Sequence, residues 1–489
     1  MRSYFHVLSL LLMIITIQST ILFGQTVNKQ QNEIELKIKQ VESNLVGNVQ
    51  IENIPSPKWT LEERMRFYHA NGLSISVIKD YKVEWTKYYG WADSMEQRPV
   101  TSTTRFQAAS NSKSLHAIGI LKLVQEGKIQ LDKDINTYLK SWKFPYDSLS
   151  KNKKITVANL LSHTAGLSTH GFRGYKKGEP LPSIVQILDG VEPSNSQPVR
   201  SEFEPSEHFN YSGGGTIISQ LILTDVTGMP YDEYMFKNVL APLGMNNSSF
   251  SLPALNGNES ILASGYYDDG YKVEGGYNIH PELAAAGLWT TSTDLAKYVI
   301  ETQLALEGKS KKVLNQKTTK LRLTPYLDKE SALGVFILDR GGVKYFNHGG
   351  TNEGFVSQYV GSLEGGNGVV VMTNTLNPLF LDEIIYSVAH TYNWKNFTPE
   401  IKKVTTIPDS FMNKYVGSYQ LEQQTVTIEK KEDGFYINNL KGNSSWKMYF
   451  TDNFNFFVLE DRIRFSFETD SPDQSIFLLL NDWKLKKLN

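Results

Sequence analysis

The sequence predicts an α+β fold for most of the chain, followed by a small β-barrel domain. The chain has 489 residues, which is too long for one small domain and long enough to bury a large core. Strand patterns occur at both ends of the region from about 55 to 395, with helical patterns between them, and this order is typical of an α+β layer domain. After about Tyr415 the chain consists of evenly spaced short strand patterns with polar turns, which predict the barrel.

The composition is that of a soluble globular protein. Hydrophobic residues make up 40% of the chain and charged residues 21%, which are ordinary values. The net charge is −1 and the 50 basic residues are scattered along the sequence. No basic stripe is therefore available for a nucleic acid, and we expect no nucleic acid partner.

Residues 1–24 have the order of a secretory signal peptide. A basic residue, Arg2, precedes the apolar stretch 7–17 (VLSLLLMIITI), and the small residue Gly24 stands before a hydrophilic segment. An uncleaved anchor running to Phe23 is the alternative, but it would be short for a bilayer span. The chain has no cysteine, which suits an oxidising bacterial envelope and leaves no lipid or disulfide site. We expect an exported protein, periplasmic or extracellular, with no transmembrane domain in the mature chain.

The larger domain is expected over 58–395, after a polar leader or linker over 25–57. A capping box at 60–63 (TLEE) opens its first helix, and an apolar-periodic helix follows Ser110 directly. The further helices are expected at 217–227 and 293–306. The strands are expected at 73–78, 83–89, 355–362 and 368–373, the first two forming a β-hairpin.

The C-terminal domain is expected over 405–489. The turn sequence Asp433-Gly434 predicts a hairpin between two of its strands. The expected strands are 425–428, 435–437, 454–459, 463–467 and 476–480.

Several sequence signatures of enzymes are missing. The chain has no G-x-S-x-G, H-E-x-x-H, Walker or G-x-G-x-x-G motif. It has no cysteine, and its nine histidines never pair at metal-ligand spacing. We therefore expect neither a metal nor a cofactor.

Ser110 and Lys113 form a Ser-x-x-Lys motif in the one position where the spacing can matter. Residues three apart share a face of a helix, so the helix after Ser110 brings the two side chains together. The helix N-terminus can also favour a developing oxyanion, and the lysine can act as a base in its neutral form. Taken alone, the motif also fits a serine N-cap beside an exposed lysine. Four other matches lie in a strand or in polar loops and begin at Ser76, Ser148, Ser150 and Ser444.

Two further motifs accompany this one in chain order. Residues 209–215 (FNYSGGG) precede a predicted helix, and residues 347–351 (NHGGT) precede a predicted strand. With these motifs the chain resembles the class C β-lactamases and penicillin-binding-protein-like serine hydrolases, a family that includes esterases, D-aminopeptidases and D-Ala-D-Ala carboxypeptidases. The resemblance runs from about Leu73 to Thr373. Its connecting blocks are 158–167 (ANLLSHTAGL), 239–245 (VLAPLGM) and 286–295 (AGLWTTSTDL).

This resemblance implies a fold and a set of roles. The fold is an antiparallel sheet flanked by helices with an all-helical region beside it, and the tail resembles the β-barrel that many of these hydrolases carry. Ser110 is implied as the nucleophile, Lys113 as its base and Tyr211 as the proton shuttle to the leaving group. The backbone N–H groups of Ser110 and Thr351 are implied as the oxyanion hole. His348 stands where the family has the Lys of a Lys-Thr-Gly triplet, followed by Gly350 and Thr351 in the substrate site.

Two positions depart from the family pattern or align with it loosely. Gly213 stands where many relatives have an Asn that holds the substrate's amide side chain. His170 falls near the position of a substrate-binding Gln in β-lactamases. His116 and His163 lie inside helical or connecting blocks, and we interpret both as structural.

The leading function is therefore an acyl hydrolase that cleaves an ester or amide of a small-molecule or short-peptide substrate through an acyl-enzyme on Ser110. A D-amino-acid peptidase or D-Ala-D-Ala carboxypeptidase of cell-wall metabolism is the alternative with the same mechanism. A catalytically inactive binding homologue is a further alternative, against which the presence of Ser110, Lys113 and Tyr211 together argues. The oligomeric state is left open.

Overall fold

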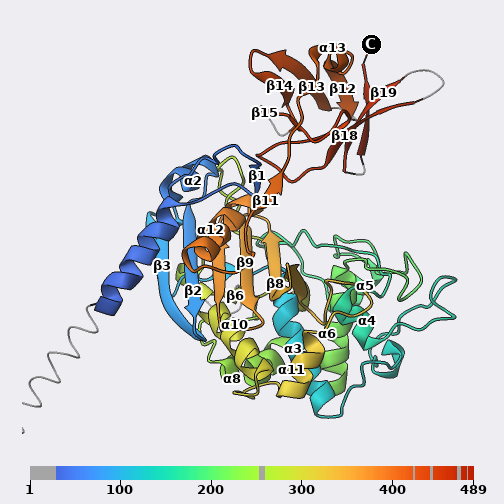
Figure 1. Ribbon diagram of the computed structural model, residues 1–489. Coiled ribbons are helices and arrows are strands. Elements are labelled where there is room, and N and C mark those ends of the chain that lie inside the picture. Colours follow the sequence, from blue (N-terminus) through green and yellow to red (C-terminus); the bar gives the residue numbers. More distant parts are fainter. Residues whose placement is uncertain are drawn as a thin grey trace, which may run out of the picture. The chain divides into compact units, whose positions relative to one another are not determined.

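The computed structural model describes residues 29–252, 259–421, 424–440, 444–470, 475–481 and 483–488 (Figure 1). The predicted signal peptide, 1–24, lies outside the described residues. The chain forms two compact units. Unit 1 contains the described residues up to Glu42 and Leu61–Asn396, and unit 2 contains Ser43–Thr60 and Phe397–Asn489. That the ranges 58–395 and 405–489 are two domains that fold independently stays a prediction.

The centre of unit 1 is a seven-stranded antiparallel sheet whose strands come from both ends of the unit, as predicted. Its order is β4-β3-β2-β10-β9-β8-β7. The strands are β2 (Gly72–Lys79), β3 (Lys82–Asp93), β4 (Arg98–Pro99), β7 (Phe336–Arg340), β8 (Val343–Asn352), β9 (Phe355–Ser362) and β10 (Gly368–Thr373). The two groups of strands meet where β10 pairs with β2, with Val371 opposite Ile75.

The predicted hairpin of β2 and β3 turns at Asp80 and Tyr81, which have φ of 50° and 62°. Two successive positive φ angles match the right-handed twist of the flanking strands, which favours a tight turn.

Helices cover both faces of this sheet. All six residues of β10 are buried, which requires cover on both faces because successive side chains of a strand point in opposite directions. Helices α10 (Ser292–Leu306) and α12 (Pro378–Thr391) both pack on β9 and β10. Arg64 of α2 (Leu61–Phe67) forms a buried salt bridge of 2.6 Å with Glu383 of α12, which ties two helices that are far apart in the sequence.

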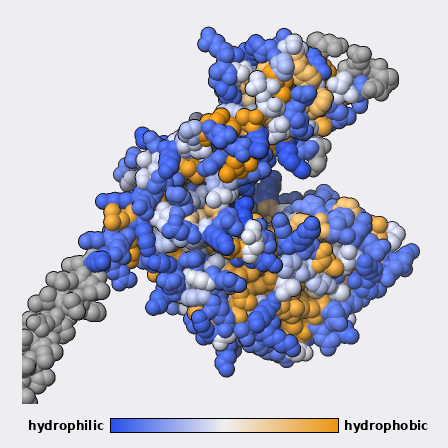
Figure 2. Space-filling model, viewed as in Figure 1, coloured by the Kyte–Doolittle hydropathy of each residue, from blue (hydrophilic) through white to orange (hydrophobic). Residues whose placement is uncertain are grey.

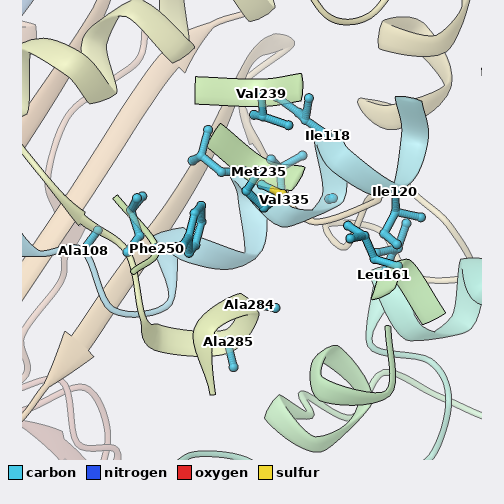
Figure 3. Close-up of a cluster of buried hydrophobic side chains, with 14 of the residues drawn as sticks. Ala108, Ile118, Ile120, Leu161, Met235, Val239, Phe250, Ala284, Ala285 and Val335 are labelled. Atoms are coloured by element: carbon cyan, nitrogen blue, oxygen red, sulfur yellow. The ribbon is translucent and has the colours of Figure 1, made fainter. Parts of the chain in front are cut away.

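A mainly helical region lies beside the sheet and is built around α3 (Asn111–Gln125) (Figure 1). Twelve of the fifteen residues of α3 are buried, so it is a central helix rather than an amphipathic surface helix. Ile118 and Ile120 of α3 belong to the hydrophobic cluster of Figure 3, together with Leu161 and Met235. The other helices here are α4 (Val157–Ser162), α5 (Ile184–Asp189), α6 (Gly213–Thr227), α7 (Tyr231–Met235), α8 (Ala241–Leu243), α9 (Leu283–Ala286) and α11 (Gln316–Arg322).

The segment expected as a leader or linker, 25–57, has regular structure in its described part. Residues 29–43 form a helix in which Ile38 and Val41 are buried. Strand β1 (Val49–Ile51) then pairs in parallel with β11 (Glu400–Lys402) within unit 2. The structure thus differs from a loose leader, because apolar residues hidden in a polar sequence pack against the folded chain.

Unit 2 is a nearly closed sheet of nine strands, as predicted for a small barrel. The strand order is β15-β14-β13-β12-β20-β19-β18-β17-β16. Tyr415, Tyr419 and Phe467 contribute aromatic rings to its core. The strands are β12 (Gly417–Leu421), β13 (Gln424–Lys431), β14 (Gly434–Asn438), β15 (Ser445–Lys447), β16 (Tyr449–Phe450), β17 (Asn455–Phe457), β18 (Phe465–Thr469), β19 (Ile476–Leu480) and β20 (Trp483–Lys487).

The visible surface of both units is mostly hydrophilic, with apolar side chains in small groups (Figure 2), which is ordinary for a folded chain in water. Among the described residues, no helix is long and apolar enough to cross a bilayer.

Candidate active site

Ser110 stands at the N-cap position of α3, but its hydroxyl does not act as a cap. The residue has φ −63° and ψ −12°, and its side chain makes no capping hydrogen bond. Ala109 before it has φ of 48°, a left-handed conformation that costs energy for a residue with a Cβ and that is common at functional sites. The alternative of a serine cap beside an exposed lysine does not fit, because Lys113 is only 5% exposed.

Lys113 reaches back along one turn of α3 to Ser110. Its Nζ lies 3.0 Å from Ser110 Oγ and 2.8 Å from the carbonyl oxygen of Ala285 in α9. No carboxylate of the described residues forms an ion pair with Lys113. The amine is therefore held by two oxygen atoms that carry no formal charge.

Tyr211 lies beside this pair and is held by His163. Lys113 Nζ is 5.1 Å from the centroid of the Tyr211 ring, and the rings of Tyr211 and His163 lie 4.3 Å apart at 33°. His163 Nδ1 accepts a hydrogen bond of 3.2 Å from the backbone N–H of Ser212, and the Ser212 hydroxyl caps α6 through Gly215 N at 2.9 Å. Burial, with the charge of Lys113 second, holds the pKa of His163 well below its usual range. His163 thus fixes the loop that carries Tyr211 and stays neutral.

Residues 347–351 precede β9, the strand that the sequence predicts after them, and they also lie inside a strand themselves, β8. A Cβ at Gly350 would lie 2.3 Å from the carbonyl oxygen of Ala108 and 2.7 Å from Ser110 N. Such distances exclude any side chain, so glycine allows the backbone of β8 to pass directly against the start of α3. Thr351, the next residue, has an exposed side chain.

His348 is buried on β8 and is electrically neutral near physiological pH. Its Nδ1 lies 2.6 Å from the carbonyl oxygen of Gly349, to which it donates because a carbonyl can only accept. Burial, and then the charge of Lys113, lower the pKa of His348 to about 3. Its ring lies 6.4 Å from that of Tyr211. His348 therefore supplies no positive charge to the site near physiological pH.

Gly213 and His170 lie close to each other, because a Cβ at Gly213 would lie 3.4 Å from the carbonyl oxygen of His170. Gly213 is the first residue of α6, and a Cβ there would lie 2.9 Å from the ring carbon Cε2 of Phe172. His170 is exposed; its Nδ1 contacts the carbonyl oxygen of Tyr211 at 2.5 Å and its Nε2 lies 3.4 Å from Glu202. The structure thus brings His170 to the backbone of Tyr211.

His116, interpreted as structural, lies within the helical core. Its Nε2 lies 2.7 Å from Ser219 Oγ of α6, and its Nδ1 lies 3.2 Å from Tyr231 OH of α7. Burial lowers its pKa to about 3. These contacts account for His116 as a neutral side chain that joins three helices.

A buried pair, His280 and Glu282, lies in the segment that leads into α9, and no sequence pattern predicts it. Their side chains are 3.8 Å apart and are 2% and 0% exposed. Neither has a hydrogen-bond partner among the described residues. Burial raises the pKa of Glu282 to about 7 and lowers that of His280 to about 4, with the charge of Lys113 as a second cause for His280. The pair neighbours the candidate site, because α9 supplies the Ala285 carbonyl to Lys113. In the described part of the chain, no group of three or more His, Asp or Glu residues is placed so that it could hold a metal ion.

Curated relatives of this chain include a protein named flp and a putative penicillin-binding protein. "Protein flp" of Staphylococcus aureus (strain MRSA252) is 26% identical over 364 residues, which cover 72% of this chain and 69% of the relative. "Putative penicillin-binding protein PbpX" of Bacillus subtilis (strain 168) is 27% identical over 281 residues, which cover 56% of this chain and 63% of the relative. The chain thus spans about two thirds of the length of the curated relatives that it matches.

Solved structures show the same fold. The octameric penicillin-binding protein homologue from Pyrococcus abyssi has a TM-score of 0.57 at 21% identity, covering 87% of this chain and 98% of that one. The beta-lactamase/D-alanine carboxypeptidase from Pseudomonas syringae has a TM-score of 0.54 at 20% identity, covering 67% of this chain and 96% of that one. The model of the Beta-lactamase family matches residues 60–391. That range contains every residue of the candidate site. This chain therefore belongs to the Beta-lactamase family of serine hydrolases.

Proposed function

We propose that this protein cleaves an ester or amide bond through a covalent acyl-enzyme on Ser110. The observation that carries the proposal is the distance of 3.0 Å between Lys113 Nζ and Ser110 Oγ at the start of α3. A nucleophile needs a hydroxyl that is not otherwise engaged and a base within hydrogen-bond reach. Ser110 meets the first condition, because its hydroxyl caps no backbone N–H group.

In the proposed acylation step, Ser110 Oγ forms a bond to the carbonyl carbon while Lys113 acts as the base for the hydroxyl proton. Tyr211 passes a proton to the leaving oxygen or nitrogen as its bond to carbon breaks. The backbone N–H groups of Ser110 and Thr351 stabilise the oxyanion, and donors of this kind are worth about 3–4 kcal/mol each when removed. The close passage of Gly350 against Ser110 N supports this arrangement. Water then attacks the acyl-enzyme and releases the acid.

The site favours uncharged ester substrates over carboxylated amides such as penicillins. The pKa of His348 is about 3, so His348 offers no cation for a substrate carboxylate. Gly213 offers no side-chain amide for an acylamido group, and a buried unpaired amide costs roughly 1–3 kcal/mol. The alternative of a D-amino-acid peptidase is disfavoured by Gly213 in the same way, whereas His348 favours it, because a histidine at this position also occurs among the D-peptidases that the chain resembles.

Labelling with a fluorophosphonate probe tests the nucleophile. We expect one probe per chain, located on Ser110 by mass spectrometry of the digested protein. Ser110→Ala should lose the label, whereas Ser148→Ala should keep it. Ser148 is a matched control, because it begins another Ser-x-x-Lys sequence but is exposed in a loop. Full labelling of Ser110→Ala would overturn the proposal.

A substrate panel tests the preference. We expect measurable hydrolysis of short-chain p-nitrophenyl esters and poor hydrolysis of penicillins, cephalosporins and D-Ala-D-Ala peptides. Gly213→Asn should shift the ratio toward β-lactams if the Phe172 ring moves to admit the side chain. Cephalosporin turnover by the unchanged protein with kcat/KM equal to that of its best ester would contradict this preference.

The expected export of the protein also stays a proposal. The basic residue and apolar stretch before Gly24 predict a mature chain that begins near Gln25 in the periplasm or outside the cell. N-terminal sequencing of protein from the envelope fraction would show Met1 intact if no cleavage occurs.

A further inference from the structure

Partly exposed phenylalanine rings stand against the two aromatic residues of the candidate site. The Phe336 ring centroid lies 5.2 Å from that of His348 and 6.5 Å from that of Tyr211. The Phe209 ring lies 6.0 Å from Phe336 and 6.2 Å from His163. Phe209 is 37% exposed and Phe336 is half-buried. We call Phe209 and Phe336 the aromatic wall.

A strand holds one ring of the aromatic wall in place, and a hydrogen-bonded loop holds the other. Phe336 begins β7 and pairs with Asn347, the residue before His348 on β8. Phe209 lies two residues before Tyr211, in a loop whose Asn210 N–H donates to the carbonyl oxygen of His163 at 2.7 Å. The rings are therefore positioned by the same strand and loop that carry His348 and Tyr211, and they do not depend on a loose segment.

The charges around the wall do not favour an anion. His163 and His348 are neutral near pH 7, because burial lowers the pKa of each. In the described part of the chain, Lys113 is the one cation that contacts a ring of this group, and Ser110 and Ala285 already occupy its amine. At the rim, Glu202 accepts a hydrogen bond of 3.0 Å from Asn210 and lies 3.4 Å from exposed His170.

Proximity decides which part of a substrate meets the wall, and this step rests on the proposed function. The acid that protonates a leaving group must lie within hydrogen-bond reach of it. Under the proposed function that acid is Tyr211, so the leaving group lies beside Tyr211 and hence beside Phe336 and Phe209. We infer that the aromatic wall binds an uncharged aromatic or bulky apolar leaving group and makes the protein selective for esters of such alcohols.

The reaction is balanced without any further reactant. The Ser110 Oγ–carbon bond forms and the carbon–oxygen bond to the alcohol breaks. The hydroxyl proton of Ser110 passes through Lys113 and Tyr211 to the departing oxygen, which leaves as the neutral alcohol. Water then supplies the hydroxyl group of the released acid and the proton that restores Ser110.

Acetate esters with a constant acyl group test the inference on the full chain. The set is ethyl acetate, 2-phenylethyl acetate and the acetate ester of 4-hydroxybutanoate, which is also a primary alcohol and carries a carboxylate. Their alcohols are of similar acidity, so differences report binding. We expect kcat/KM for the phenylethyl ester to exceed that for ethyl acetate by about tenfold or more, as for the burial of one ring. The carboxylated ester should be the poorest of the three.

Variants of the wall separate binding from chemistry. Phe336→Ala and Phe209→Ala should each raise KM for 2-phenylethyl acetate about three- to tenfold with a smaller change in kcat. Phe336→Leu keeps the site apolar and should lose less. Phe336→Lys should shift the ratio toward the carboxylated ester. Phe236→Ala is the matched control, because Phe236 is 51% exposed and has no ring contact with the group; it should change neither constant.

The outcomes distinguish this inference from the proposed function. Labelling of Ser110 with equal kcat/KM for the ethyl and phenylethyl esters would overturn the inference alone. A fall in kcat for every ester in Phe336→Leu, with KM unchanged, would also overturn it, because a mere structural role has that effect. Absence of labelling at Ser110 would overturn the proposed function and this inference with it.

Discussion

The two units of the molecule differ most in what they bury. Unit 1 buries ionisable side chains beside its core, among them Lys113, His348 and Glu282. In the described residues of unit 2, Asn438 is the one buried polar side chain, and none of the nine histidines of the sequence lies in 43–60 or 397–489. Buried groups with shifted pKa values concentrate at functional sites because their burial costs stability and needs a reason. The chemistry is therefore expected in unit 1, and unit 2 is a conventional hydrophobic module.

The largest effect should come from the nucleophile. Ser110→Ala should lower turnover of an activated ester by on the order of 10⁴ or more, because nucleophile, base and acid act as one unit. Lys113→Ala and Tyr211→Phe should each cause a large part of that loss, and the double variant should lose far less than the product of the two. Steady-state kinetics with active-site titration measure this. Near-normal turnover by Ser110→Ala would place the chemistry elsewhere.

Acid should destabilise unit 1 and spare unit 2. The pKa values of His116 and His348 are about 3, and that of His280 about 4. Each lies below the unfolded value near 6.5, so the stability that these neutral histidines support is complete above about pH 6.5 and is lost as the pH falls through the folded pKa. Each would cost about 2 kcal/mol between about pH 7.5 and 5.0, and the opposite effect of Glu282 is about 2 kcal/mol, which leaves a net loss of about 4 kcal/mol.

The protein is equilibrated in urea at each of the two pH values and is then labelled by a short pulse of hydrogen exchange at one fixed pH. The exchange of peptides from each unit then gives a separate unfolding curve for unit 1 and for unit 2. The urea midpoint of unit 1 should fall at the lower pH, and that of unit 2, which has no histidine, should change much less. Equal shifts in both units would contradict the assignment of the loss to the buried histidines.

The third effect concerns Glu282, whose pKa of about 7 lies above its unfolded value. The unfolded chain releases the proton near pH 4.5 and the folded chain holds it until about 7, so stability falls as the pH rises through this window. Glu282→Gln removes the titration and keeps the shape. From about pH 5.0 to 7.5, the unchanged protein should lose about 2 kcal/mol more in free energy of unfolding than the variant. Urea denaturation at both pH values measures this, and parallel curves would mean that Glu282 is ionised or solvated in the fold.

Sequence patterns predicted the elements well where local chemistry decides them. The start of α2 at Leu61, the hairpin of β2 and β3 and the start of α3 after Ser110 depend on residues close in sequence. The start of α6 was expected at 217 but lies at Gly213, because glycines are poor helix formers and the Ser212 cap compensates for them. The sequence did not predict that residues 347–351 lie in a strand themselves, because a pair of glycines resembles a turn.

Long-range packing explains what the patterns could not reveal. His163 was interpreted as structural, and only the fold shows its ring against Tyr211 at 4.3 Å. Glu282 appears in the sequence as an ordinary acidic residue before an alanine run, and its burial depends on residues far along the chain. Phe336 reaches His348 through strand pairing between β7 and β8. Such residues can be recognised as candidates for the site only from the tertiary structure. It places the Phe336 ring against His348 and leaves the carboxylate of Glu282 buried without a hydrogen-bond partner.

The smallest effect should follow removal of unit 2. A chain shortened to 25–396 keeps the sheet, the helices and every contact of the candidate site, and few contacts normally cross a domain boundary. It leaves β1 without its partner β11, so local exposure of residues 43–60 is expected. Labelling of Ser110 and kcat/KM for an activated ester should stay within about threefold of the full chain.

A chain ending at Thr373 is the matched control, because it also lacks α12, which buries Phe380 and Ile384. That control should unfold, since loss of such residues from a core costs about 2–5 kcal/mol each. If both shortened chains were insoluble, unit 2 would be required to complete the fold of unit 1. The two units would then fold as one, and the difference between them would not separate a catalytic unit from an independent hydrophobic one.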